Sequence, residues 1–197
     1  MFRLNTKTHQ AWWLRSYVFM LGFGFLLLTG CSNMKVEHYK DTEPKLDLFA
    51  YFEGKTYAWG LFQTRTGEVK RRFYVDITGT IDGDTLTLDE QFVYDDGETE
   101  QRIWVIDRIA ANQYQGSAGD VIGIAYGQTA GSVFNWRYTL DLPYGSSSIH
   151  VQFDDWMFLQ TDGVMLNRAE VKKWGLRVGE VTLAFSKQDH RAGEARQ

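Results

Sequence analysis

The sequence has few of the residues that hold a small domain together by covalent or metal links. Its 197 residues contain one cysteine, Cys31, so the chain cannot form an internal disulfide bond. The four histidines lie far apart, at His9, His38, His150 and His190, and none falls in a spacing typical of structural zinc. A two-histidine site between His38 and His150 is the remaining alternative, and we expect neither a bound metal nor a cofactor. The stability of the fold must then come from packing.

Basic residues are also scarce. The chain has 21 lysines and arginines against 25 aspartates and glutamates, a net charge of −4. Removal of residues 1–30, argued below, takes away three basic residues and no acidic one, which leaves 167 residues with a net charge of −7. We therefore exclude nucleic acid as a partner, because no surface basic enough to follow a phosphate backbone is indicated. A chain of this length matches one ordinary domain.

The first 30 residues have the layout of a secretory signal peptide, with a cationic start, an apolar segment at 17–28 and small residues at the cleavage site. The tetrapeptide Leu28-Thr29-Gly30-Cys31 resembles the lipobox of bacterial lipoproteins. That resemblance implies a diacylglyceryl group on the Cys31 thiol and an acylated amino terminus. Ser32 follows the cysteine in place of aspartate, which by the same resemblance favours the periplasmic leaflet of an outer membrane.

Two alternatives for this segment stay open. An uncleaved membrane anchor would need about 20 apolar residues, and the segment 17–28 is shorter. An ordinary secreted protein would carry a free thiol, which is a liability in an oxidising compartment. Our interpretation is a lipoprotein signal peptide (1–30), a lipidated tether (31–44), a folded domain (45–187) and a flexible polar tail (188–197).

The folded domain is predicted to open with a short helix or turn over 45–52, after which hydrophobic residues alternate with polar ones at a period of two. Turns at Gly67, Gly83 and Gly97 separate four such segments and predict an antiparallel meander. Centring each hairpin on its turn gives four facing pairs: Trp59 with Phe73, Ile77 with Leu88, Leu88 with Trp104, and Glu90 with Arg102. These pairs place the large apolar residues on one face of the sheet.

Alternating segments continue to residue 185, for example at Phe134-Asn135-Trp136-Arg137-Tyr138. Eight to ten strands joined by short loops predict an all-β fold, an antiparallel up-and-down β-barrel, because closure removes unpaired edges. A barrel of about eight strands can enclose one small ligand, as lipocalins do. A two-sheet sandwich is the alternative architecture.

Four charged residues occupy positions on the apolar face: Arg71, Glu90, Arg102 and Asp155. Burying charge is costly unless it is paired, so one interpretation is a neutral internal network with arginines bidentate on carboxylates. The other is that one arginine is left to hold an anionic head group, such as a fatty-acid carboxylate. The apolar part of that ligand would contact the aromatic residues expected on the same face, which are Trp59, Phe73, Phe92, Trp104 and Trp136. Asp154 is the alternative to Asp155 at the inner position.

We predict no catalytic residue. The glycines between 119 and 131 lack the lysine and the helix that a phosphate-binding loop requires, and no serine stands in a nucleophile elbow. Glu90 with Asp154 or Asp155 has the residue types of an acid–base pair, but no partner base or metal accompanies them. A lipid-modifying enzyme is the least favoured class.

Motifs spread from about Phe52 to Lys187 resemble the bacterial lipoprotein family known as domain of unknown function 3833. They are Phe52-x-Gly54, Trp59-Gly60, Arg72-Phe73, Glu90-x-Phe92-x-Tyr94-x-Asp96-Gly97, Arg102-x-Trp104, Asn135-Trp136-x-Tyr138 and Phe153-Asp154-Asp155-Trp156-Met157. The family has no established activity and supplies no catalytic residues. The resemblance implies a lipobox-bearing envelope protein with a lipocalin-like β fold.

The sequence therefore predicts a lipid-anchored protein of the bacterial cell envelope whose barrel binds or carries a hydrophobic or amphipathic ligand, such as a lipid or fatty acid. Its expected contacts are the membrane, through Cys31, and an envelope protein partner. The alternative is a structural or interaction module with a barrel filled by side chains. The volume of the barrel interior separates these two functions.

Overall fold

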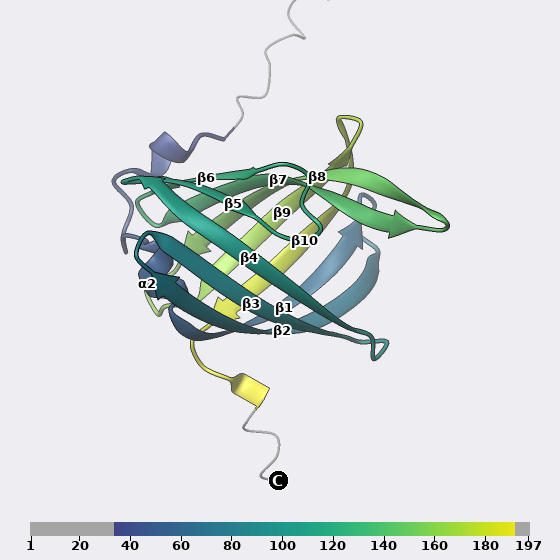
Figure 1. Ribbon diagram of the computed structural model, residues 1–197, viewed down its shortest axis with the longest axis horizontal. Helices are drawn as coiled ribbons and strands as arrows, with labels where there is room; N and C mark the ends of the chain where they lie inside the picture. The colour runs from purple at the N-terminus through teal and green to yellow at the C-terminus, as the bar shows by residue number, and fades with distance from the viewer. Residues whose placement is uncertain (1–33, 192–197) are drawn as a thin grey trace, which may run out of the picture. The chain divides into compact units, whose positions relative to one another are not determined.

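Ten antiparallel strands close into a barrel in the computed structural model of this protein, which describes residues 34–191 (Figure 1). Each strand pairs with its neighbours in sequence, and β1 pairs with β10 to close the ring. The predicted up-and-down barrel is confirmed, whereas the signal peptide and Cys31 lie outside the described residues. The elements are η2 (Val36–Tyr39), α2 (Leu48–Phe52), β1 (Gly54–Thr64), β2 (Val69–Asp82), β3 (Thr85–Tyr94), β4 (Thr99–Ala110), β5 (Gln113–Ser117), β6 (Ala125–Ala130), β7 (Val133–Tyr144), β8 (Ser147–Leu159), β9 (Met165–Lys173) and β10 (Leu176–Ser186).

The strand register agrees with the predicted pairs in part. Leu88 lies opposite Trp104 and Glu90 lies opposite Arg102, as the hairpin centred on Gly97 predicts. Ile77 lies opposite Glu90 instead of Leu88, because the β2–β3 turn falls one residue later than its assumed centre. A shift of two residues keeps every side chain on its predicted face.

The interior position predicted for Trp59 is wrong. A β-bulge near the end of β1 shifts the register, so that Gly60 lies opposite Phe73 and Trp59 lies opposite Tyr74. A slip of one residue moves every side chain to the other face of the sheet. Trp59 therefore lies on the outer wall, where its ring centroid is 5.6 Å from those of Tyr74 and His190.

Helix α2 closes one end of the barrel, the end opposite the long β7–β8 hairpin (Figure 1). Asp47 caps the helix, and its carboxylate accepts hydrogen bonds from the N–H groups of Phe49 and Ala50. The Asp47 carboxylate also pairs with Arg108 at 3.2 Å. The short apolar stretch forms a helix here because three of its five side chains enter the core: Leu48, Phe49 and Phe52.

The segments before α2 and after β10 also contact the barrel. In the described part of the predicted tether, 34–44, Val36 is buried against Val133 and the Thr42 hydroxyl accepts a hydrogen bond from the Ser132 N–H at 3.0 Å. The predicted tail begins at 188, and in its described part the Arg191 guanidinium lies 3.2 Å from the ring centroid of Tyr74. Among residues 34–191, no helix is long and apolar enough to cross a membrane.

Glycine is required where α2 meets the wall. A Cβ atom at Gly79 of β2 would lie 1.9 Å from the carbonyl oxygen of Phe52, a contact with backbone that no side-chain rotation relieves. At Gly119, in the loop between β5 and β6, a Cβ atom would meet nothing within 4 Å. A side chain is therefore excluded at Gly79 by close packing, whereas the position of Gly119 is open.

We expect Gly79→Ala to displace α2 and to lower the free energy of unfolding by about 2 kcal/mol or more, because the added methyl overpacks a backbone contact. Gly119→Ala is the matched control and should change stability by less than about 0.5 kcal/mol. Denaturant titration followed by circular dichroism measures both. Equal midpoints for the two variants would contradict the seating of α2 against β2.

Candidate ligand-binding site

The barrel encloses a cavity of about 950 Å³. It extends from Leu48 and Phe52 of α2 to Glu98 and Asp141, which are exposed at the opposite end. This volume lies at the upper end of the usual range for small-molecule pockets, about 300–1,000 Å³. The cavity is therefore closed by α2 at one end and reaches solvent at the other.

The half of the cavity next to α2 is apolar. Alternating positions of the strands point inward and supply large aliphatic and aromatic side chains, which include Phe52, Ile77, Leu88, Trp104, Ile106, Phe134, Trp136 and Phe185. Trp104 and Trp136 meet edge to face, with ring centroids 5.5 Å apart. This half can hold only an apolar group.

Eight of the nine interior residues named from the sequence line this cavity, and Trp59 is the exception described above. The eight are Arg71, Phe73, Glu90, Phe92, Arg102, Trp104, Trp136 and Asp155. Contact of any of them with a ligand stays a prediction. The four charged residues do not form the neutral network that is one interpretation of the sequence, because both arginines pair with other carboxylates.

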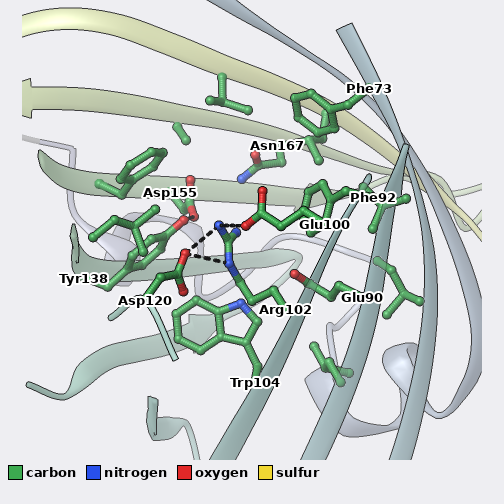
Figure 2. A pocket seen from close by; sticks show the side chains of 18 of the residues that line it. Phe73, Glu90, Phe92, Glu100, Arg102, Trp104, Asp120, Tyr138, Asp155 and Asn167 are labelled. Atoms are coloured by element: carbon green, nitrogen blue, oxygen red, sulfur yellow. Dashed lines mark hydrogen bonds and ion pairs between the residues drawn. The ribbon is translucent and has the colours of Figure 1, made fainter. Parts of the chain in front are cut away.

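Arg102 of β4 binds a carboxylate from a loop (Figure 2). Its Nε and Nη2 both donate to Oδ2 of Asp120, at 3.1 and 2.8 Å, and Nη2 lies 3.5 Å from Oε1 of Glu100. Burial would lower the pKa of Arg102, but the surrounding negative charge, above all that of Glu90, raises it overall. Arg102 is thus held in its charged form by carboxylates on several sides.

Glu90 and Arg102 face each other across the β3–β4 ladder, as predicted, but they do not form an ion pair with each other. Among the described residues, the Glu90 carboxyl makes no hydrogen bond and has no cation within ion-pair distance, because the Arg102 guanidinium extends toward Asp120 (Figure 2). Burial raises the pKa of Glu90 to about 7, and attraction to Arg102 only partly opposes that shift.

Asp155 of β8, rather than Asp154, occupies the inner position. Its Oδ2 accepts a hydrogen bond from the Tyr138 hydroxyl at 2.8 Å. Burial raises the pKa of Asp155 to about 7, against the opposing effect of the Tyr138 hydrogen bond. Asp154 points outward, where it accepts hydrogen bonds from Asn135 at 2.7 Å and from Arg137 at 3.1 Å.

Arg71 stands at the open end of the cavity. Its guanidinium pairs with Asp96 at 3.0 Å and with Glu98, and it lies 3.4 Å from the ring centroid of Tyr94. Burial would lower the pKa of Arg71, but the hydrogen bonds to these two carboxylates raise it overall. Both arginines of the lining are therefore already paired.

Several polar residues of the lining were not named from the sequence as site residues, among them Glu100, Asp120, Tyr138 and Asn167. Glu100 is two positions from Arg102, and Tyr138 is two positions from Trp136. Each pair lies on the same inner face, so the period of two could have predicted these residues. Asn167 alternates with buried Met165 and Ala169 in the same way. Asp120 lies in the β5–β6 loop, where alternation carries no information.

Within residues 34–191, no group of three or more histidine, cysteine, aspartate or glutamate side chains is placed to hold a metal ion. The described site is a cavity with an apolar end beside α2. About halfway along the barrel it holds the Arg102–Asp120 pair and two further carboxyl groups, those of Glu90 and Asp155. Such a lining can enclose an amphipathic molecule and recognise its polar group.

The closed up-and-down barrel with a lined cavity defines a lipocalin-like β-barrel protein. The chain belongs to the family described as protein of unknown function (DUF3833), whose model matches residues 25–187. No curated protein matches the chain. Among solved structures, it is similar to the S-type phycobiliprotein lyase CPES from Guillardia theta, with a TM-score of 0.50 and 9% identity over 80% of this chain and 96% of that chain. This likeness shows a shared fold.

Because the pKa values of Glu90 and Asp155 are raised in the folded protein, its free energy of unfolding should fall as the pH rises. The folded state holds Glu90 and Asp155 protonated up to about pH 7, whereas the unfolded chain releases those protons near the ordinary values of 4.5 and 3.8. The folded protein therefore binds more protons in this window, and the free energy of unfolding should drop by about 5 kcal/mol between pH 5 and pH 8, about half from each group.

The double variant Glu90→Gln/Asp155→Asn removes both titrations and should flatten this decline. Asp89→Asn, on the outer face of β3, is the matched control and should retain it. Urea unfolding at a series of pH values measures the slopes. A double variant with the slope of the wild type would show that the two carboxyl groups titrate normally.

Proposed function

We propose that this protein is a lipid-anchored protein of the bacterial cell envelope whose barrel binds or carries a hydrophobic or amphipathic molecule. The observation that carries the binding function is the cavity of about 950 Å³, apolar beside α2 and polar at mid-height. An acyl chain or another elongated apolar group fits the first region, and a polar head fits the second. The proposed location in the cell envelope rests on the amino-terminal sequence alone.

The cavity argues against the alternative of a filled barrel that serves only as an interaction module. Side chains can just fill a barrel of about eight strands, and this barrel has ten, so its interior has room for a ligand as well as side chains. Glu90 and Asp155 also face this enclosed chamber instead of an open cleft, which is why binding is favoured over action on a lipid substrate.

The proposed anchor is Cys31, with acyl chains on its thiol and on the amino terminus created by cleavage after Gly30. Each buried methylene contributes about 0.8 kcal/mol, and two or more chains hold a protein stably on a bilayer. The proposed location is the periplasmic leaflet of the outer membrane, on the strength of Ser32 after the cysteine. An envelope protein is the proposed macromolecular partner.

Ligand binding is tested with the neutral fluorescent probe N-phenyl-1-naphthylamine, alongside native mass spectrometry of gently extracted protein. We expect saturable binding and a co-purifying lipid-like mass. Ala169→Trp, which fills the cavity from β9, should weaken probe binding by about tenfold or more. Leu166→Trp, at an exposed position of the same strand, is the control and should bind as the wild type does.

Absence of both a bound molecule and probe uptake would refute the carrier function. Equal probe affinity for the two tryptophan variants would place binding outside the barrel. Thermal melts of both variants verify that each is folded before affinities are compared.

The anchor is tested by intact mass of the protein from membranes. We expect cleavage before Cys31 and the added mass of a diacylglyceryl group and an acyl chain, both of which Cys31→Ser abolishes, with release of the variant into the soluble fraction. Wild-type protein that is freely soluble and carries an unmodified thiol would contradict lipid anchoring.

A further inference from the structure

The cavity contains more acid than base. Its lining includes two cations, Arg71 and Arg102, against six carboxyl groups: Glu90, Glu98, Glu100, Asp120, Asp141 and Asp155. Even with Glu90 and Asp155 protonated, four carboxylates face two cations. An anionic head group entering such a chamber meets net repulsion, and a cationic one meets net attraction.

Both arginines already have carboxylate counter-ions. Arg71 is paired with Asp96 and Glu98 at the mouth, and Arg102 donates twice to Asp120 and lies 3.5 Å from Glu100. A fatty-acid carboxylate could reach an unused N–H donor, such as Nε of Arg71, but it would be a third negative group around one positive charge, which is unfavourable in a site shielded from water. The fatty-acid head group considered from the sequence is therefore disfavoured.

Two acids are available instead. Among the described residues, Glu90 has no hydrogen-bond partner, and Asp155 has the Tyr138 hydroxyl but no cation within ion-pair distance. They project from β3 and β8 into the same chamber, and in the view of Figure 2 they lie on opposite sides of the Arg102 guanidinium. Each is flanked on its own strand by apolar residues that point toward α2: Leu88 and Met157.

Aromatic rings stand around these two acids. Phe92 and Trp104 lie beside Glu90, and Tyr138 bonds Asp155 while its ring meets that of Trp104 edge to face at a centroid distance of 5.2 Å (Figure 2). Aromatic faces attract cations, and an acid among aromatic rings is a recurrent arrangement for ammonium groups. An ammonium group here gains from both kinds of contact.

We propose that the ligand of this barrel is an amphipathic amine, with its ammonium group in the acidic middle of the cavity beside Glu90 and Asp155, and its apolar part in the region beside α2. This inference rests on the proposed binding function and specifies the chemical class of the ligand. Deeper placement of the head group is excluded by the apolar lining, and placement at the mouth would leave the apolar half unused.

Ammonium binding should be linked to proton release. The groups that face Glu90 are Arg102 and Glu100 of β4, Asp120 of the β5–β6 loop and Asp155 of β8. Burial holds the pKa of Glu90 and Asp155 at about 7, so at neutral pH each carries a partial proton that an incoming cation displaces.

The test compares four probes with the same dodecyl chain, each below its micelle concentration: dodecylamine, dodecyltrimethylammonium, dodecanol and dodecanoate. Isothermal titration calorimetry with the folded wild-type protein should give dodecylamine a Kd at least about tenfold lower than those of dodecanol and dodecanoate at about pH 7.5. Repetition in buffers of different ionisation enthalpy should show protons released with both cations.

The double variant Glu90→Gln/Asp155→Asn should lose the preference for dodecylamine over dodecanol, measured as the ratio of the two Kd values. Asp89→Asn, which removes one charge from the outer face of β3, should keep the preference. Dodecanoate or dodecanol binding as tightly as dodecylamine would overturn the amine assignment and leave a carrier function standing. Failure of all four probes to bind would overturn the carrier function itself.

Discussion

The pairing of Arg102 with Asp120 determines the charge distribution of the whole cavity. A buried arginine needs a counter-ion, because an uncompensated buried charge costs several kcal/mol. Across the β3–β4 ladder the nearest acid by register is Glu90, yet the guanidinium extends to the β5–β6 loop and donates twice to one oxygen of Asp120. That choice leaves Glu90 unpaired in an enclosed space. Burial then raises the pKa of Glu90, and attraction to Arg102 opposes that shift only in part.

Helix α2 makes the two ends of the cavity chemically different. Because Leu48 and Phe52 cover one end, polar groups cannot be solvated there, and the inward positions near α2 are apolar. Toward the other end the strands carry Arg102 and then Arg71, which stands where solvent enters. A molecule with one apolar and one polar part therefore has a single favourable orientation. The glycine at position 79 permits this arrangement, because any side chain there would collide with the end of the helix.

Period-two alternation and glycine turns are enough to predict the barrel, the β3–β4 register and eight of the residues that line the cavity. Trp59 was misplaced because a β-bulge leaves no mark in hydrophobic alternation, and one extra residue reverses the faces of a strand. Alternation also located Glu90 and Arg102, and it could have located Tyr138. It could not show that Arg102 prefers Asp120 to Glu90, since that partner comes from a loop whose path depends on the completed fold. Register identifies residues that face each other, whereas ion pairing depends on where long side chains find the best geometry.

The segment that precedes α2 is held in place by the barrel itself. The N–H of Leu46 donates to the carbonyl oxygen of Gly131 in the β6–β7 turn, so the chain enters the barrel at the end that α2 closes. The Ser132 N–H donates to the Thr42 hydroxyl, and Val36 is buried against Val133. The chain therefore follows a fixed path to α2, and movement of the helix away from the cavity would have to break these contacts as well as those of the helix.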